Sequence, residues 1–229
     1  MNRIHTFATS LGIALILGGM TPIVQAAPPQ ILLVQNTAEN LIRQGTEKYE
    51  KGDYKGAIQD FTEAIRLDPK NADAYVNLGN ARDDAGDGKG AIEAYNQALE
   101  VDPKNASAFY NRGLAYRRQG KNQLAVEDYS QTINLNPNFD RVWVNRGVVR
   151  SLLGNRQGAL EDFNQALKLN PSFGEAYYNR GNIRANQGDK PGAIEDFQKA
   201  ADIYQKEGKT DYYRDAMNNL KKLQQSTTL

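Results

Sequence analysis

A period of 34 residues runs through most of this 229-residue chain. Two glycine series keep this interval, at Gly45, Gly79, Gly113, Gly147 and Gly181, and at Gly52, Gly86, Gly120, Gly154 and Gly188. So do an alanine series at Ala57, Ala91, Ala125, Ala159 and Ala193, and an aromatic series at Phe61, Tyr95, Tyr129, Phe163 and Phe197. A repeat of this length predicts an array of stacked supersecondary units instead of a domain with one central core.

Each unit contains the pattern of two helices joined by a tight turn. The units are 38–71, 72–105, 106–139, 140–173 and 174–207. A large apolar residue at position 4 and glycine at position 8 are one helical turn apart, and the glycine at position 15 supplies the positive φ that ends a helix. Small and aromatic residues at positions 20, 24 and 27 mark a second helix, which proline at position 32 ends in the first four units.

This pattern resembles the tetratricopeptide repeat, and the resemblance covers residues 38–207. It implies an all-α fold, a right-handed α-α superhelix (solenoid) of stacked helical hairpins, with the first helices lining a concave groove. The fifth unit departs from the pattern, because Gln205 stands where the other units have proline. We therefore expect a longer second helix there.

A further helix is expected over about 211–225, within a C-terminal segment 208–229 that we interpret as a capping helix and tail. Its apolar residues Tyr213, Met217 and Leu220 form one stripe, which suits a helix that covers the exposed end of a solenoid. The alternative is a docking helix for a partner.

The first 26 residues have the pattern of an export signal. A mildly positive start precedes an apolar run over 7–17, and small residues at Val24 and Ala26 indicate cleavage after Ala26. The run is shorter than the ~20 residues of a membrane-spanning helix, so an uncleaved anchor is the weaker alternative. We interpret 27–37 as a leader and expect an exported, non-cytoplasmic protein, in the periplasm or an equivalent lumen.

Composition removes most catalytic chemistry. The chain has no cysteine, and its one histidine, His5, lies in the predicted signal peptide. Thiolate metal sites, imidazole bases and serine–histidine triads are therefore excluded from the exported chain. We predict no catalytic residues, metal site or cofactor; the remote alternative is a hydrolase that uses carboxylates alone. The net charge of +1 gives no reason to expect nucleic acid as a partner.

An asparagine column is the first candidate binding feature. Position 6 of the first helix is asparagine in four units, at Asn77, Asn111, Asn145 and Asn179. The resemblance places this position in the groove, where amide groups that both donate and accept hydrogen bonds are suited to bracket the backbone of an extended peptide. The alternative is that these amides bind local backbone or neighbouring helices.

Residues beside the column complete the predicted peptide site. They are Tyr110 and Tyr178 at position 5, Asn80 and Asn182 at position 9, and Arg117. Arg117, Arg118 and Arg141 give the predicted groove a basic middle, whereas Asp73, Asp83 and Asp84 make one end acidic, which would orient a partner. The alternatives are packing between first helices for the tyrosines and a solvated surface for the charges.

Positions 7 and 23 vary together. Where position 7 is arginine (Arg112, Arg146, Arg180), position 23 is aspartate (Asp128, Asp162, Asp196); where position 7 is Leu78, position 23 is Ala94. We predict partly buried pairs of arginine and aspartate at these positions. The arginine is then structural and is not a ligand for phosphate or nucleic acid.

The sequence thus favours an exported, non-enzymatic module that binds a protein or extended peptide in its concave groove. A scaffold that self-associates, or that assembles a membrane-associated complex through its ends, is the alternative within the same class.

Overall fold

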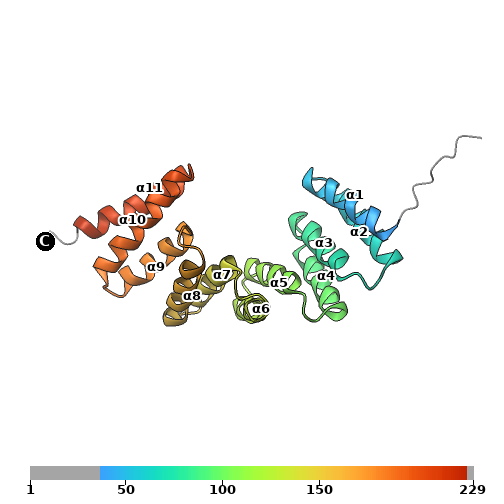
Figure 1. Cartoon of the computed structure of the whole chain (residues 1–229), viewed down its shortest axis with the longest axis horizontal. Helices are drawn as coiled ribbons and strands as arrows, with labels where there is room; N and C mark the ends of the chain where they lie inside the picture. The colour runs from blue at the N-terminus through green and yellow to red at the C-terminus, as the bar shows by residue number, and fades with distance from the viewer. Residues whose placement is uncertain (1–36, 226–229) are drawn as a thin grey trace, which may run out of the picture. The chain divides into compact units, whose positions relative to one another are not determined.

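The computed structural model describes residues 37–225, which form eleven α-helices (Figure 1). The helices are α1 Ala38–Glu50, α2 Tyr54–Leu67, α3 Ala72–Asp84, α4 Gly88–Val101, α5 Ala106–Arg118, α6 Asn122–Leu135, α7 Asp140–Leu152, α8 Arg156–Leu169, α9 Gly174–Asn186, α10 Lys190–Lys206 and α11 Thr210–Gln225. The predicted signal peptide, the leader up to residue 36 and the last four residues of the predicted tail lie outside the described residues.

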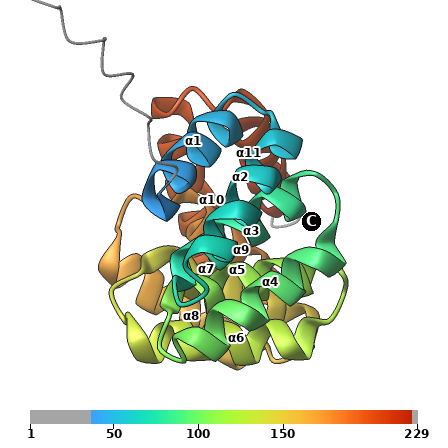
Figure 2. The ribbon, with the colours of Figure 1, turned by 90° about the vertical axis from the view of Figure 1, so that its right-hand side faces the viewer.

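The helices pack as consecutive antiparallel hairpins, so the predicted all-α fold of stacked hairpins is confirmed. Each predicted unit holds one hairpin, and each second helix also contacts the first helix of the next unit. Figure 2 shows α6 and α8 along the lower edge of the view, with α5 and α7 above them. Between residues 37 and 225, no helix has the length and hydropathy needed to cross a bilayer.

The turn inside each hairpin depends on the glycine at position 15. In the fourth unit α7 ends at Leu152, and Gly154 adopts a φ of 82°, which side chains with a Cβ rarely tolerate. Asn155 then begins α8, because its Oδ1 accepts a hydrogen bond of 3.0 Å from the backbone N–H of Gly158. The glycines at position 15 of all five units have positive φ, as predicted.

The core between the two helices of a hairpin is a glycine packed against an aromatic ring. A Cβ placed on Gly147 would lie 2.7 Å from Cε1 of Phe163, whose side chain is fully buried. The other units repeat this contact with Phe61, Tyr95, Tyr129 or Phe197 as the ring. Position 8 is therefore glycine because the helices approach too closely for any side chain there.

The predicted arginine and aspartate pairs are present in all three hairpins that carry both residues. In the third unit Arg112 donates to both carboxylate oxygens of Asp128, at 2.8 and 2.7 Å. Arg146 binds Asp162 at 3.0 and 2.7 Å, and Arg180 binds Asp196 at 3.0 and 2.6 Å. The prediction is confirmed, and each pair lies across its own hairpin.

Each of these arginines also reaches the preceding hairpin. Its Nη1 atom donates to a side chain at position 25 of the previous unit, at distances of 2.6–3.0 Å; the acceptors are Asn96, Ser130 and Asn164. One guanidinium group therefore links three helices, which the sequence comparison of positions 7 and 23 did not reveal.

The C-terminal end differs from the other units, as expected. Helix α10 has 17 residues where the four preceding second helices have 14, and α11 follows after Gly208. Leu220 of α11 is buried, and Tyr213 and Met217 pack beside it against α10 and α9. The predicted apolar stripe of this helix is confirmed.

Two buried tyrosines that occupy equivalent positions differ in their hydrogen bonds. The hydroxyl of Tyr95 donates to Oδ1 of Asn80 at 2.8 Å. In the third unit Leu114 occupies the position that Asn80 has in the second unit. The buried hydroxyl of Tyr129 therefore has no hydrogen-bond partner among residues 37–225. A buried hydroxyl without a partner costs stability.

We therefore expect Tyr129→Phe to raise the free energy of unfolding by about 1 kcal/mol, because the substitution keeps the ring and removes the unpaired group. Tyr95→Phe is the matched control and is expected to lower it by about 0.5–1.5 kcal/mol, since it leaves Asn80 without its donor. Urea unfolding followed by circular dichroism measures both. Equal losses in the two variants would contradict this account.

Candidate functional site

The first helices form a continuous row, in which α1 contacts α3, α3 contacts α5, and α7 contacts α9. All nine residues of the predicted peptide site lie on helices of this row. Their surroundings differ strongly from one unit to the next.

Three of the predicted residues bind one another. The side-chain amide of Asn145 donates to the hydroxyl of Tyr110 at 3.0 Å, and Oδ1 of Asn145 accepts from Nη1 of Arg117 at 3.4 Å. Asn145 is only 8% exposed. The ring of Tyr110 packs on Phe139 with 4.7 Å between centroids. These groups hold α5 and α7 together, and the amide of Asn145 is already occupied.

Asn179, Tyr178 and Asn182 also make internal contacts. The amide of Asn179 donates to the backbone oxygen of Glu175 at 2.9 Å, one turn earlier in α9. Asn219 of α11 donates to the hydroxyl of Tyr178 at 3.2 Å and to Oδ1 of Asn182 at 3.4 Å. Tyr178 and Asn182 therefore fix α11 in addition to facing outward in part.

The remaining predicted residues border small hollows. Asn77 and Asn80 line one of about 180 Å³, where Asn80 accepts from Tyr95. Asn111 lines two others, of about 190 and 290 Å³. The acidic residues predicted at this end bind neighbours: Asp83 pairs with Arg118, and Asp84 accepts from Tyr49. Burial, and then the hydrogen bond to Asp84, raise the pKa of Tyr49 to about 12.

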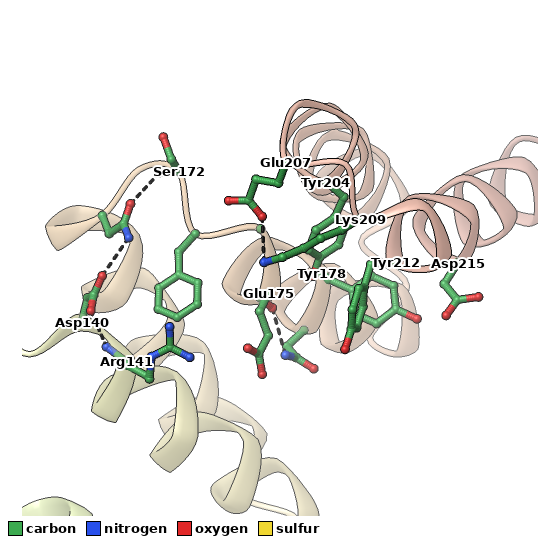
Figure 3. Close-up of a pocket in the computed structure, with 14 residues that line it drawn as sticks. Asp140, Arg141, Ser172, Glu175, Tyr178, Tyr204, Glu207, Lys209, Tyr212 and Asp215 are labelled. Carbon is green, nitrogen blue, oxygen red and sulfur yellow. Dashed lines mark hydrogen bonds and ion pairs between the residues drawn. The ribbon is translucent and has the colours of Figure 1, made fainter. Parts of the chain in front are cut away.

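A larger cavity of about 580 Å³, which we call the α9–α11 cavity, lies at the C-terminal end of the row (Figure 3). Its walls come from the start of α7, the loop before α9, the start of α9, the end of α10 and the start of α11. The lining residues are Asp140, Arg141, Asn170, Ser172, Phe173, Gly174, Glu175, Tyr178, Asn179, Tyr204, Glu207, Lys209, Tyr212 and Asp215.

One wall of the cavity is a braced loop. Asn170 donates to Oδ2 of Asp140 at 2.8 Å, and its own Oδ1 accepts from the backbone N–H of Ser172 at 3.0 Å. The guanidinium carbon of Arg141 lies 5.8 Å from the centre of the Phe173 ring. The loop is thus held in place by α7 before any partner arrives.

The opposite wall is aromatic. The rings of Tyr204 and Tyr212 pack with 5.4 Å between centroids, and Tyr178 stands edge-on to Phe197. Tyr204 reaches the cavity because α10 runs past the point where proline ends the other second helices. Gly174 leaves room for it, since a Cβ on Gly174 would lie 2.9 Å from Cε1 of Tyr204.

Charges in the cavity are mainly acidic. Lys209 forms an ion pair with Glu207 at 2.8 Å, and the carboxylate of Asp140 accepts from Asn170 and from the backbone of Arg141. Within residues 37–225, no group of three or more histidine or acidic side chains is arranged to hold a metal ion. Burial raises the pKa of Tyr204, and the negative charge of Glu175 adds to the effect.

The sequence prediction reached only part of this cavity. Tyr178 and Asn179 were predicted, whereas Glu175, Tyr212 and Asp215 were not chosen as site residues. Two signals point to the cavity in retrospect: glycine at position 1 of the fifth unit, and the absence of proline at its position 32. Their effect depends on the packing of α10 and α11 against α9, which the sequence alone does not give.

Comparisons with solved structures give the same fold. The chain shares 28% sequence identity with MamA, whose crystal structure it matches with a TM-score of 0.67 over 72% of this chain and 96% of MamA. It is 24% identical to YrrB, described as a TPR protein with an unusual peptide-binding site, with a TM-score of 0.64 over 74% of this chain and 88% of YrrB. Pseudomonas aeruginosa PilF is 21% identical, with a TM-score of 0.67 over 81% of this chain and 91% of PilF.

Family models agree with these structures. Curated protein sequences give no significant match. One model of the TPR repeat matches residues 45–83 and 84–120, and two models of the tetratricopeptide repeat match residues 106–139 and 152–207. Because these matches together span well over half of its residues, the chain belongs to the tetratricopeptide repeat family.

Proposed function

We propose that this protein is an exported, non-enzymatic module that binds an extended segment of a partner protein along its row of first helices. Solenoids of this kind present extended binding surfaces, which supports an interaction role. The observation that carries the proposal is the α9–α11 cavity, which has a volume of about 580 Å³ and is bordered by aromatic rings. Export is supported by the sequence pattern of residues 1–26.

Energetics favour the cavity over the asparagine column as the anchor. Four hydrogen bonds at about 0.5–1.5 kcal/mol each barely offset an association cost of roughly 4–15 kcal/mol. Asn145 and Asn179 each already use one of their two amide N–H donors inside the protein. A side chain buried in the cavity adds about 1.5–3 kcal/mol, which hydrogen bonds alone do not supply. Asn77 and Asn111, which border the smaller hollows of the row, then align the segment, and the cavity holds it.

A steric block tests this function. Ser172 lies at the cavity, and Asn138 occupies the same loop position one unit earlier without lining the cavity. Both are exposed. We expect tagged Ser172→Trp, recovered from the exported fraction with Ala27 at its N-terminus, to lose partner proteins that wild type and Asn138→Trp both capture. Quantitative mass spectrometry of the captured proteins measures the difference.

Equal recovery of partners by Ser172→Trp and Asn138→Trp would contradict binding at this cavity. Recovery of the protein only from the cytoplasm would contradict export. Melting temperatures of both variants, followed by circular dichroism, establish that neither substitution acts by unfolding the chain.

A further inference from the structure

Two carboxylates of the α9–α11 cavity are left without a counter-charge. Glu175 and Asp215 line the cavity and are exposed, and neither side chain forms an ion pair or hydrogen bond with residues 37–225. Two cationic groups also line the cavity: Lys209 pairs with Glu207, and Arg141 keeps its charge but lies over the ring of Phe173 on the other wall. The α9 and α11 side therefore presents two carboxylates without an ion-pair partner among the described residues.

Aromatic faces lie between these carboxylates. The ring of Tyr212 packs on that of Tyr204, and in the view of Figure 3 Tyr178 and Tyr212 are drawn between Glu175 and Asp215. Tyr212 is 61% exposed, although it is a large aromatic residue. The face of an aromatic ring attracts a cation electrostatically, and carboxylates beside the ring strengthen the field in the same direction.

A largely buried tyrosine supplies a third, independent feature. Tyr204 is only 4% exposed and lines the cavity, and its hydroxyl group forms no hydrogen bond with residues 37–225. Its oxygen is therefore available to accept a hydrogen bond from a ligand.

We propose that Glu175, Tyr178, Tyr204, Tyr212 and Asp215 form a cation subsite that binds a lysine or arginine side chain of the partner segment. The carboxylates supply the counter-charge, the ring of Tyr212 contacts the cationic group, and the hydroxyl of Tyr204 accepts a hydrogen bond from it. This inference rests on the proposed function, because it names the chemistry that the cavity selects. An acidic segment would meet repulsion from the same carboxylates.

Small probes test the charge requirement directly. We expect N-acetylarginine methylamide, titrated into the isotope-labelled exported chain, to shift the amide NMR signals of the first turns of α9 and α11 in a saturable, salt-sensitive manner. N-acetylcitrulline methylamide has nearly the same shape without the charge and is expected to leave them unchanged. N-acetylglutamate methylamide is expected to bind no better than citrulline.

Variants locate the binding. Glu175→Gln, Asp215→Asn and Tyr212→Ala are each expected to weaken arginine binding about two- to fivefold, the effect of one exposed charge or cation–π contact. Tyr212→Phe keeps the ring and is expected to retain affinity. Glu195, an exposed acidic residue on α10 that does not line the cavity, provides the matched control, and Glu195→Gln is expected to have no effect.

The outcomes separate this inference from the proposed function. Equal shifts by the citrulline probe, or affinity unaffected by Glu175→Gln and Asp215→Asn, would overturn the cation subsite. If Ser172→Trp still loses its partners in that case, the proposed function stands. Concentration-dependent self-association of wild type that is absent in Ser172→Trp, measured by sedimentation, would show that a second copy is the occupant and would also overturn the inference.

Discussion

Phe163→Ala is expected to lower the free energy of unfolding by about 3–5 kcal/mol, which is the usual cost of truncating a fully buried aromatic side chain. The ring is completely inaccessible and packs with Ala159, Ala166 and Ile183 in one cluster. On its other side it touches the backbone of Gly147, which has no side chain to move into the vacated space. The residues around Phe163 therefore cannot fill the space that the alanine substitution leaves.

The measurement is urea unfolding of the exported chain, followed by circular dichroism. Lys168→Ala, an exposed change five residues later on the same helix, is the control, and its effect is expected to stay within about 0.5 kcal/mol. Because each unit contacts mainly its neighbours, hydrogen exchange of Phe163→Ala should accelerate most in α7 and α8. An unchanged midpoint would contradict the packing described for position 24.

Positions that depend on contacts inside one unit were predictable from the sequence. The glycine series at positions 8 and 15 and the aromatic series at position 24 act within a single hairpin, so five copies of the pattern reveal them. The pairing of Arg112 with Asp128 was found in the same way, because the leucine and alanine of the second unit vary with it.

Contacts between units were harder to predict, because they join positions that need not vary in step. The sequence left open that these asparagines bind neighbouring helices, but it did not select Tyr110 and Arg117 of the preceding unit as the partners of Asn145. The α9–α11 cavity was missed for a related reason: Tyr212 and Asp215 lie outside the repeat and have no counterparts to compare. Period and spacing identify the hairpin, and only three-dimensional packing identifies the cavity.

Arg112→Leu is expected to lower the free energy of unfolding by about 3–5 kcal/mol, because it leaves a buried aspartate charge without its partner. Asp128 is 4% exposed, and Arg112 is the only basic residue that binds it among residues 37–225. The substitution also removes the hydrogen bond from Arg112 to Asn96 of the preceding hairpin. Denaturant unfolding measures the loss.

Adding Asp128→Ala to Arg112→Leu should restore part of this stability. The double variant reproduces the combination found naturally at Leu78 and Ala94, where both side chains are buried and no charge is present. We expect its total loss to be smaller than the sum of the two single losses by at least about 1 kcal/mol. Strictly additive losses would contradict a direct interaction between the two positions.

The fourth unit supplies an internal comparison for the size of the effect. There Arg150 also donates to both oxygens of Asp162, each at 3.0 Å, so the aspartate keeps a cation when Arg146 is replaced. Arg146→Leu is therefore expected to cost less than Arg112→Leu, although the two arginines make equivalent bonds to their aspartates. Equal costs of the two substitutions would contradict this account. Both arginines donate a hydrogen bond to the preceding hairpin, so equal costs would mean that the loss of this bond dominates and that the unpaired carboxylate contributes little.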